Sequence, residues 1–493
     1  MRTGQLRLIL EFVKNRNKET LEFVKIAWYY NCENVKSMEL GVIVKRKIYG
    51  ELIEWKKSWS GRRALLINGA RRVGKSYIAE EFAKNEYKTY ILIDFSICGD
   101  EIKDIFRNYI HDLDSFFMQM SVAYGVKLYN RETLFIFDEI QMFPQARGAI
   151  KHLVADGRYD YLETGSLVSI KKNVKDIVIP SEERHLYMRP MDFEEFLWAL
   201  NEDELMPYIA NSYEKMIPCG ALAHRKAMYL FRQYMIIGGM PQAVLEYINT
   251  GDFSAVDMVK RDILNLYRDD IVKYADDNYV KVCSIFDEIP SQLSKHDKKF
   301  RLSAINKNAR IRDYEDSLFW LSDAMIINCC YNSSEPNIGL KLNMDRATLK
   351  CYMADTGLLI SHAFDEKGIT TEQIYKKLLL ENIEINEGMI MENIVAQMLV
   401  SSGHRLYFYA NSDRKDSSSN MEIDFLLARS KLERRHNISA IEVKSSKQYR
   451  LSSLQKYKAK YDKFLHKSIV LHTKDIMIKN DIIYLPLYMA AHL

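Results

Sequence analysis

Residues 64–76 read ALLINGARRVGKS, a short apolar run that leads directly into a glycine-containing loop. The loop Gly69–Ser76 matches the pattern GxxxxGK[ST] at every fixed position. This pattern indicates a phosphate-binding loop only where a strand precedes it and a helix follows it. Here Ala64–Ile67 is typical of a buried strand, and Ser76–Lys84 is typical of a helix. The sequence therefore predicts a P-loop that binds ATP.

The chemistry of a P-loop assigns a role to each residue of this segment. Successive backbone N–H groups surround the phosphates, and the N-terminus of the next helix adds its positive dipole end. We expect Lys75 to pair with the β- and γ-phosphates and the Ser76 hydroxyl to bind Mg²⁺. ATP and Mg²⁺ are thus the expected cofactors. The predicted nucleotide-binding residues are Gly69, Ala70, Arg71, Arg72, Val73, Gly74, Lys75 and Ser76.

Three more short apolar runs follow the loop and alternate with helical patterns. They are Tyr90–Ile93, Leu134–Phe137 and Tyr159–Glu163. Strands that alternate with helices in this way form a parallel sheet that is covered by helices on both faces. The predicted fold class is therefore α/β, with the parallel sheet of a P-loop NTPase.

Polar residues end two of these predicted strands. Asp138 and Glu139 follow one of them directly, about 60 residues after the P-loop. We expect Asp138 to hold Mg²⁺ beside Ser76, and Glu139 to polarise the attacking water as a catalytic residue. Thr164, at the end of the next strand, is a candidate contact to the γ-phosphate. An ordinary turn residue is the alternative interpretation of Thr164.

A second set of charged residues lies near the C-terminus. Glu392 lies in the predicted helix Ile390–Val400, Asp424 in a strand, and Glu442 and Lys444 in the next strand. Glu442 and Lys444 share one face because side chains alternate along a strand. Asp424 and Glu442 would bind Mg²⁺, Glu392 would complete the shell, and Lys444 would stabilise charge or orient a water. A set of structural salt bridges is the alternative.

Composition limits the class of protein. The chain has 493 residues, 47% of them hydrophobic, which is enough for several domains. The net charge of +4 gives no general signature of polyanion binding, so DNA contact would require a local basic patch. Seven scattered cysteines without a CxxC pair fit a reducing cytoplasm and disfavour a zinc site. No apolar run reaches the roughly 18 residues of a membrane span, so no membrane partner is expected.

Several segments together resemble a large group of prokaryotic AAA-like P-loop ATPases. In that group the P-loop commonly reads G-x-R-x-x-G-K-[ST], which Arg71 or Arg72 matches. The resemblance covers roughly Met38 to Leu493. The matching segments are LLINGARRVGKS (65–76), LFIFDEIQMFP (134–144), ETGSL (163–167), LYMRPMDFEEFL (186–197), GGMPQAV (238–244) and YRDDI (267–271).

The resemblance implies further domains. Members of the group carry a C-terminal restriction-endonuclease-like domain of the PD-(D/E)XK type, and the Glu392, Asp424, Glu442 and Lys444 set resembles its core. The sequence departs from that motif because Ile423, and not a proline, precedes Asp424. An active nuclease, an inactive fold and a false match all remain open. Lys298–Asn343, with a basic N-terminal flank, resembles a winged helix in which Tyr314–Ser322 would enter a major groove.

We therefore predict a cytoplasmic ATPase whose hydrolysis is coupled to a nuclease-like domain acting on nucleic acid. The alternative is an ATP-dependent switch or scaffold whose inactive nuclease-like fold binds DNA, a protein partner or a second copy of the chain. The predicted parts are an N-terminal extension at 1–37, which is not certain to belong to the native protein, a P-loop domain at 38–200, a helical region at 201–296, a winged-helix-like region at 297–370 and a restriction-endonuclease-like domain at 371–493.

Overall fold

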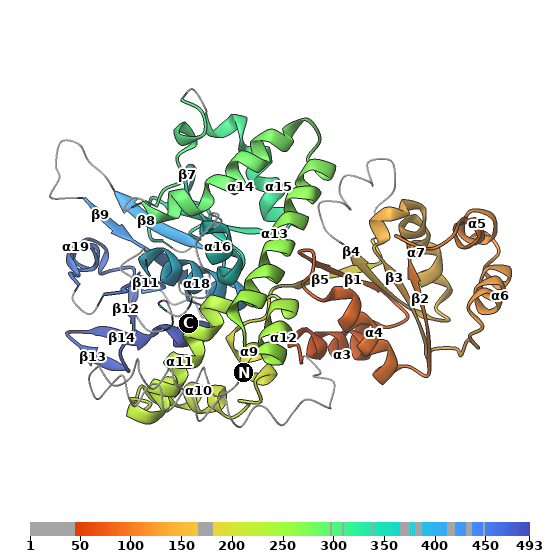
Figure 1. Cartoon of the computed structure of the whole chain (residues 1–493), viewed down its shortest axis with the longest axis horizontal. Helices are drawn as coiled ribbons and strands as arrows, with labels where there is room; N and C mark the ends of the chain where they lie inside the picture. The colour runs from red at the N-terminus through yellow and green to blue at the C-terminus, as the bar shows by residue number, and fades with distance from the viewer. Residues whose placement is uncertain are drawn as a thin grey trace, which may run out of the picture. The chain divides into compact units, whose positions relative to one another are not determined.

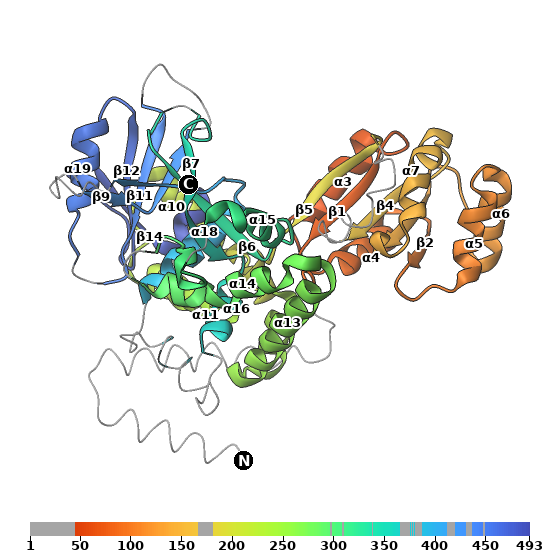
Figure 2. The ribbon, with the colours of Figure 1, turned by 90° about the horizontal axis from the view of Figure 1, so that it is seen from above.

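Figures 1 and 2 show a computed structural model of the chain. The structure describes residues 45–165, 181–295, 298–307, 310–337, 339–364, 375, 377, 379, 387–411, 420–429, 436–446 and 449–493. The predicted extension at residues 1–37 lies outside these ranges. Among the helices of the described residues, none combines the length and the apolar character that crossing a bilayer requires.

The first sheet consists of five parallel strands and confirms the predicted α/β class. Every residue of β1, β3 and β4 is buried, as in a parallel sheet that is covered on both faces. In spatial order the strands are β2 (Thr89–Asp94), β3 (Thr133–Asp138), β4 (Asp160–Gly165), β1 (Ala64–Gly69) and β5 (Glu183–Met188).

Alternate residues of β1 face two different hydrophobic cores. Leu65 and Ile67 pack with one set of helices, α3 (Ile48–Trp59) and α4 (Lys75–Glu86). Ala64 and Leu66 belong to the other core. That core is completed by α5 (Asp100–Tyr109), α6 (Leu113–Tyr124) and α7 (Pro144–Asp156). The alternation places helices on both faces, and Figure 1 shows the two groups around the sheet.

Strand β5 was not predicted from the sequence. It pairs in parallel with β1 along its whole length, with Ala64 opposite Glu183 and Gly69 opposite Met188. Only its two end residues are buried, because it lies at the edge of the sheet. An edge strand needs no continuous apolar run, so its polar sequence ERHLYM did not stand out.

A helical region follows the sheet and leads into a hairpin. Helix α15 precedes the antiparallel strands β6 (Ile327–Ser333) and β7 (Met344–Met353), and α16 (Thr356–Ala363) follows them. This is the helix–hairpin order that a winged helix requires, although the hairpin extends ten residues beyond Asn343. The helices before the hairpin are α9 (Phe193–Ala199), α10 (Leu205–Lys215), α11 (Ala221–Ile237), α12 (Pro241–Thr250), α13 (Phe253–Tyr274), α14 (Tyr279–Ser294) and α15 (Glu315–Asp323).

Two mixed sheets form the C-terminal part. One has the order β7-β6-β8-β9 and the other β10-β11-β12-β14-β13. The β7-β6-β8-β9 sheet contains strands from both sides of the predicted boundary at residue 370. Asp424 alone separates β9 from β10, so this chain segment passes from one sheet to the other at that residue. The elements are α18 (Glu387–Ser401), β8 (Tyr407–Asn411), β9 (Met421–Ile423), β10 (Phe425–Ala428), β11 (Ile438–Val443), α19 (Ser452–Tyr461), β12 (Leu465–His472), β13 (Met477–Lys479) and β14 (Ile482–Pro486).

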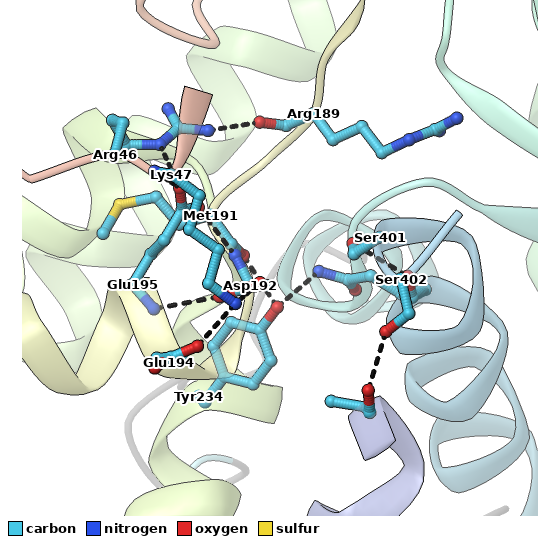
Figure 3. A network of polar contacts seen from close by, with 12 residues as sticks. Arg46, Lys47, Arg189, Met191, Asp192, Glu194, Glu195, Tyr234, Ser401 and Ser402 are labelled. Carbon is cyan, nitrogen blue, oxygen red and sulfur yellow. Dashed lines mark hydrogen bonds and ion pairs between the residues drawn. The ribbon is translucent and has the colours of Figure 1, made fainter. Parts of the chain in front are cut away.

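Hydrogen bonds and ion pairs connect Arg46 with the segment after β5 and with the helical region (Figure 3). The Arg46 guanidinium donates to the carbonyl oxygens of Val73 at 2.9 Å and Arg189 at 2.5 Å, and it pairs with Glu195 at 3.2 Å. All of these groups are buried or partly buried. Because Val73 is a P-loop residue, Arg46 ties the loop to the segment that leaves β5.

The same segment is bonded to the C-terminal helix α18. The Tyr234 hydroxyl donates to the Met191 carbonyl oxygen at 2.7 Å and accepts from Gln397 Nε2 of α18 at 2.9 Å. Met191 N–H also donates to the Gly239 carbonyl oxygen at 2.7 Å. Each of these buried groups has a hydrogen-bond partner on another element, so the contacts specify how these elements pack.

Gly239 is expected to tolerate no side chain. A Cβ atom there would lie 2.1 Å from the Met191 carbonyl oxygen. We expect Gly239→Ala to lower the free energy of unfolding by about 1–3 kcal/mol through overpacking, measured by equilibrium denaturation. Gly50→Ala in α3 is the control, because a Cβ there meets no atom within 4 Å. It should raise stability by roughly 0.5–1 kcal/mol, and equal effects of the two variants would contradict the packing argument.

Candidate functional site

The P-loop lies between β1 and α4, as predicted. Gly74 precedes α4 and adopts a left-handed conformation with φ 98°, which favours glycine. A Cβ at Gly69 would lie 2.5 Å from the Met188 carbonyl oxygen of β5, so this position is restricted by its neighbour strand. The loop backbone is thus held close to the sheet while the N-terminus of a 12-residue helix opens at Lys75.

Lys75 is buried inside the loop. Its ammonium donates to the carbonyl oxygens of Gly69 at 3.1 Å and Ala70 at 3.0 Å. Burial lowers the pKa of Lys75, and the nearby carboxylates of Glu139, Asp138 and Asp270 oppose that effect. The ammonium is therefore poorly solvated and is held by two neutral carbonyl groups, an arrangement that leaves it able to bind a stronger anionic partner.

Four residues predicted from three separate segments meet beside the loop. The Ser76 hydroxyl donates to Asp138 Oδ1 at 2.7 Å across 62 residues of sequence. Thr164 Oγ1 donates to the same carboxylate oxygen, and Glu139 N–H donates to Thr164 Oγ1 at 3.3 Å. β4 lies between β1 and β3 in the sheet, which is why Thr164 reaches both carboxylate residues.

Glu139 has an unusual backbone for a non-glycine residue. Its φ is 52°, in the left-handed region, at the turn between β3 and η2 (Ile140–Met142). Its carboxylate accepts a hydrogen bond from Gln141 Nε2. A left-handed non-glycine residue persists only where its surroundings hold it there, and such residues cluster at functional sites. The sequence analysis did not single out Gln141, although it lies two residues after Glu139 in the quoted motif.

The helical region also contributes to the P-loop surroundings. Arg71 forms an ion pair with Asp270 of α13 at 2.7 Å, and the Tyr267 hydroxyl donates to the Arg71 carbonyl oxygen at 3.3 Å. The sequence placed both α13 residues in the YRDDI segment without giving them a role. Arg184 of β5 lies with its guanidinium 4.6 Å from the centroid of the Trp59 ring.

Two of the predicted C-terminal residues, Glu392 and Asp424, lie beside a lysine that was not predicted from the sequence. Lys350 of β7 is 1% exposed. Its ammonium lies 3.0 Å from Glu392 Oε1, 2.8 Å from Glu422 Oε1 and 3.7 Å from Asp424 Oδ1. Burial lowers the pKa of Lys350, but these carboxylates outweigh it and raise that pKa well above its ordinary value. Lys350 is therefore a charged group that holds three carboxylates.

Glu392 has three polar side-chain partners in this cluster. Lys298 pairs with its Oε2, while Lys350 and the Tyr352 hydroxyl donate to its Oε1. Burial would raise the pKa of Glu392, but Lys298 and Lys350 lower it to about 2. Its carboxylate is fully committed to protein donors.

The other two predicted ligands have different partners. Asp424 Oδ2 accepts from Val443 N–H at 2.8 Å, while Glu442 pairs with Lys444 at 2.6 Å. Burial raises the pKa of both carboxyl groups. Within the described ranges, no group of three or more His, Cys, Asp or Glu side chains is arranged to hold a metal ion. The Lys350 ammonium lies beside Glu392 and Asp424, whereas Glu442 pairs with Lys444, so the metal site of Glu392, Asp424 and Glu442 stays a prediction.

The predicted DNA-contacting helix is acidic. The charged residues of α15 are Glu315, Asp316 and Asp323. Of the basic residues that flank it, Lys298 pairs with Glu392 and Lys299 lies 3.8 Å from Glu422. Acidic side chains repel phosphate, and these two lysines are directed toward the C-terminal cluster. The charges do not support insertion of this helix into a major groove.

Three family profiles match separate parts of the chain. An AAA domain matches residues 61–197, a domain of unknown function (DUF8612) matches residues 228–369, and a second domain of unknown function (DUF4143) matches residues 387–489. A search of curated proteins finds no match. The nuclease-like character predicted for the C-terminal part is thus not among the functions that these profiles describe.

Several solved structures are similar to the chain at low sequence identity and low TM-score. A Walker-type ATPase of Pyrococcus abyssi has 14% identity and a TM-score of 0.37, covering 65% of this chain and 96% of that one. AMPPCP-bound DnaA from Aquifex aeolicus has 11% identity and a TM-score of 0.24, covering 69% and 95%. Cdc6p from Pyrobaculum aerophilum has 11% identity and a TM-score of 0.25, covering 71% and 98%.

Those TM-scores are low, so the assignment depends on the family profile and on the sheet itself. The AAA profile spans β1 to β5, and the P-loop follows β1 within it. Residues 61–197 therefore match an AAA domain and form the sheet of a P-loop ATPase, which supports ATP binding by this part of the chain.

Proposed function

We propose that the chain hydrolyses MgATP at the P-loop and uses it to control a C-terminal module that binds a protein partner without cutting nucleic acid. The observation that carries the first half is the convergence of Ser76, Asp138, Thr164 and Glu139 beside the loop. The observation that carries the second half is the Lys350 ammonium among the C-terminal carboxylates.

The residues beside the P-loop fit a magnesium–nucleotide complex. The Ser76 hydroxyl oxygen and an Asp138 carboxylate oxygen lie 2.7 Å apart, and both can be ligands of a metal ion. In nucleotide sites Mg²⁺ is bound by a serine or threonine hydroxyl and an aspartate carboxylate. When bound, Mg²⁺ would neutralise charge on the phosphate oxygens of ATP. Lys75 would exchange its two loop carbonyls for phosphate oxygens, which are stronger acceptors.

Glu139 would act on the water that attacks the γ-phosphorus. The oxygen of that water forms the new P–O bond, the bond from the γ-phosphorus to the bridging oxygen breaks, and ADP leaves. Glu139 accepts a hydrogen bond from the water and takes up its proton. Thr164 positions both acidic residues, because its hydroxyl bonds to the Asp138 carboxylate and the Glu139 N–H.

Lys75→Ala tests nucleotide binding directly. Loss of an ammonium that bonds to charged phosphate oxygens should weaken ATP affinity about 10- to 100-fold, measured by calorimetric titration with ATP and Mg²⁺. Lys84→Ala is the matched control, because Lys84 lies on the same helix and its partners are the exposed-face residues Glu80 and Glu81. Equal ATP affinity of the wild-type and Lys75→Ala proteins would overturn the proposed site.

The C-terminal module is proposed to bind rather than cut. Each acidic group predicted as a metal ligand already has a protein partner, and Lys444, predicted to be catalytic, pairs with Glu442. A protein partner is favoured over DNA because α15 is acidic. Incubation with DNA or RNA and Mg²⁺ or Mn²⁺, with and without ATP, should give no more cleavage than the Glu442→Ala protein gives. Cleavage that Glu442→Ala abolishes would restore the nuclease hypothesis.

Buried hydrogen bonds between the P-loop, the segment after β5 and α18 support control of the C-terminal module by ATP. Arg46 binds the P-loop carbonyl of Val73 and the segment after β5, and Tyr234 links that segment to α18. Helix α18 also carries Glu392, which pairs with Lys350. A change in the loop on ATP binding would therefore act on groups that contact the C-terminal module.

A further inference from the structure

Helix α13 reaches the P-loop through its C-terminal half. Asp270 pairs with the Arg71 side chain at 2.7 Å, and Tyr267, which is 2% exposed, donates to the Arg71 backbone carbonyl at 3.3 Å. One loop residue is thus held at both its side chain and its backbone. The Asp270 carboxylate also acts electrostatically on Lys75, so a negative charge from the helical region lies near two of the three cations of the loop, Arg71 and Lys75.

This charge is unfavourable for a bound triphosphate. The phosphates of ATP are anions, so the Asp270 carboxylate repels them. Asp270 also pairs with the Arg71 guanidinium, which could otherwise bind a phosphate. The pair is also readily exchanged, because the Arg71 side chain is 45% exposed and that of Asp270 is 23% exposed. Partly exposed ion pairs contribute little to stability. A phosphate group with a higher charge is therefore a competitive partner for Arg71.

We propose that the Arg71 side chain changes its partner when ATP binds. It pairs with Asp270 of α13 in the nucleotide-free protein and with a phosphate group of ATP in the bound state. This inference rests on the proposed nucleotide site and extends it, because it makes α13 a part of that site. Asp270 is a positioning residue: it sets where the Arg71 side chain lies and has no role in the chemical step.

The exchange gives α13 a way to report the nucleotide state. Earlier along the same 22-residue helix, Lys260 is fully buried and donates to the carbonyl oxygens of Ile236 at 2.8 Å and Gly357 at 3.2 Å. That part of the helix is anchored to α11 and α16. Release of Asp270 would free the end near the P-loop while the anchored part stays in place.

Calorimetric titration with ATP and Mg²⁺ tests the inference on the full chain. Asp270→Asn keeps the size of the side chain and removes the competing charge, so it should bind ATP about threefold to tenfold more tightly than wild type. Asp269→Asn is the matched control, because Asp269 is the adjacent, exposed acid on the same helix. Asp270→Glu should bind ATP as the wild type does. In an Arg71→Ala background, the gain from Asp270→Asn should fall by at least about half.

A second measurement does not depend on any variant. Amide hydrogen exchange over residues 262–275 of the wild-type protein should become faster on addition of ATP, since the tie at Asp270 is lost. A role of Asp270 in stability alone would produce neither this change nor tighter ATP binding.

The outcomes separate this inference from the proposed function. Wild-type protein that binds ATP, together with an Asp270→Asn affinity no higher than that of Asp269→Asn, would overturn the inference and leave the nucleotide site intact. If Asp270→Asn fails to fold, unchanged exchange of residues 262–275 on ATP addition to wild type would overturn it instead. Absence of ATP binding by the wild type would overturn both proposals.

Discussion

Glu139→Gln is expected to slow ATP hydrolysis by about 100-fold or more while ATP binding is retained. Glutamine keeps the shape of the side chain and the hydrogen bond from Glu139 N–H to Thr164, but its amide cannot take up a proton from the attacking water. The binding groups on the loop, chiefly Lys75 and Ser76, are unchanged. The variant should therefore accumulate in the ATP-bound state.

Two assays on one preparation test this prediction. Phosphate release under single-turnover conditions gives the hydrolysis rate, and calorimetric titration gives the affinity for ATP. Glu132→Gln is a suitable control, because Glu132 is an exposed acid at the opposite end of β3. Hydrolysis by Glu139→Gln at the wild-type rate would remove Glu139 from its proposed role, and a nucleotide-dependent scaffold without turnover would predict no phosphate release from either protein.

Lys350→Met is expected to destabilise the protein strongly. It leaves Glu392, Glu422 and Asp424 close together without the ammonium that they share. Removal of one partner from a buried charge cluster costs about 3–5 kcal/mol. Lys299→Met is the control, since its ion pair with Glu422 is longer, at 3.8 Å, and is partly exposed. It should cost less than about 1 kcal/mol. Urea denaturation measures both losses.

The pH dependence of the two proteins should have opposite signs. In the wild type the pKa of Glu392 is lowered to about 2, so its contribution is present above its ordinary pKa and is lost as pH falls toward 2. Without Lys350, the crowded carboxylates should have raised pKa values, so the folded variant takes up protons first and gains stability on acidification. The stability deficit of Lys350→Met should therefore be smaller at pH 5 than at pH 8.

Added cations provide an independent check on the same cluster. In the smaller Lys350→Ala variant the three carboxylates lose the ammonium that they share, which leaves oxygen ligands for a divalent ion in its place. Ca²⁺ or Mn²⁺ should therefore restore part of the lost melting temperature in that variant and not in Lys299→Met. Equal stabilisation of both variants by the cation would show that Lys350 does not occupy the place of a metal.

The sequence alone was enough to predict the P-loop and the two acidic residues beside it. Glycines in a loop between an apolar strand and a helix have few other uses, and Asp138 and Glu139 end a strand that can only be buried. These are local constraints, since each depends on a few neighbouring residues and on backbone geometry. Strands that alternate with helices form a parallel sheet, which explains why the α/β class was predicted. The strand order β2-β3-β4-β1-β5 was known only from the structure.

The tertiary structure alone decided what the charged residues do. The series Glu392, Asp424, Glu442 and Lys444 is compatible with a metal site or with ion pairs, and the choice depends on Lys350, which enters on β7 some 42 residues before Glu392. Asp270 likewise reaches Arg71 across 199 residues. Charge pairing acts through space and leaves no periodic pattern in the chain. The sequence therefore predicts where ATP binds, while only the folded structure decided which partner each charged group has.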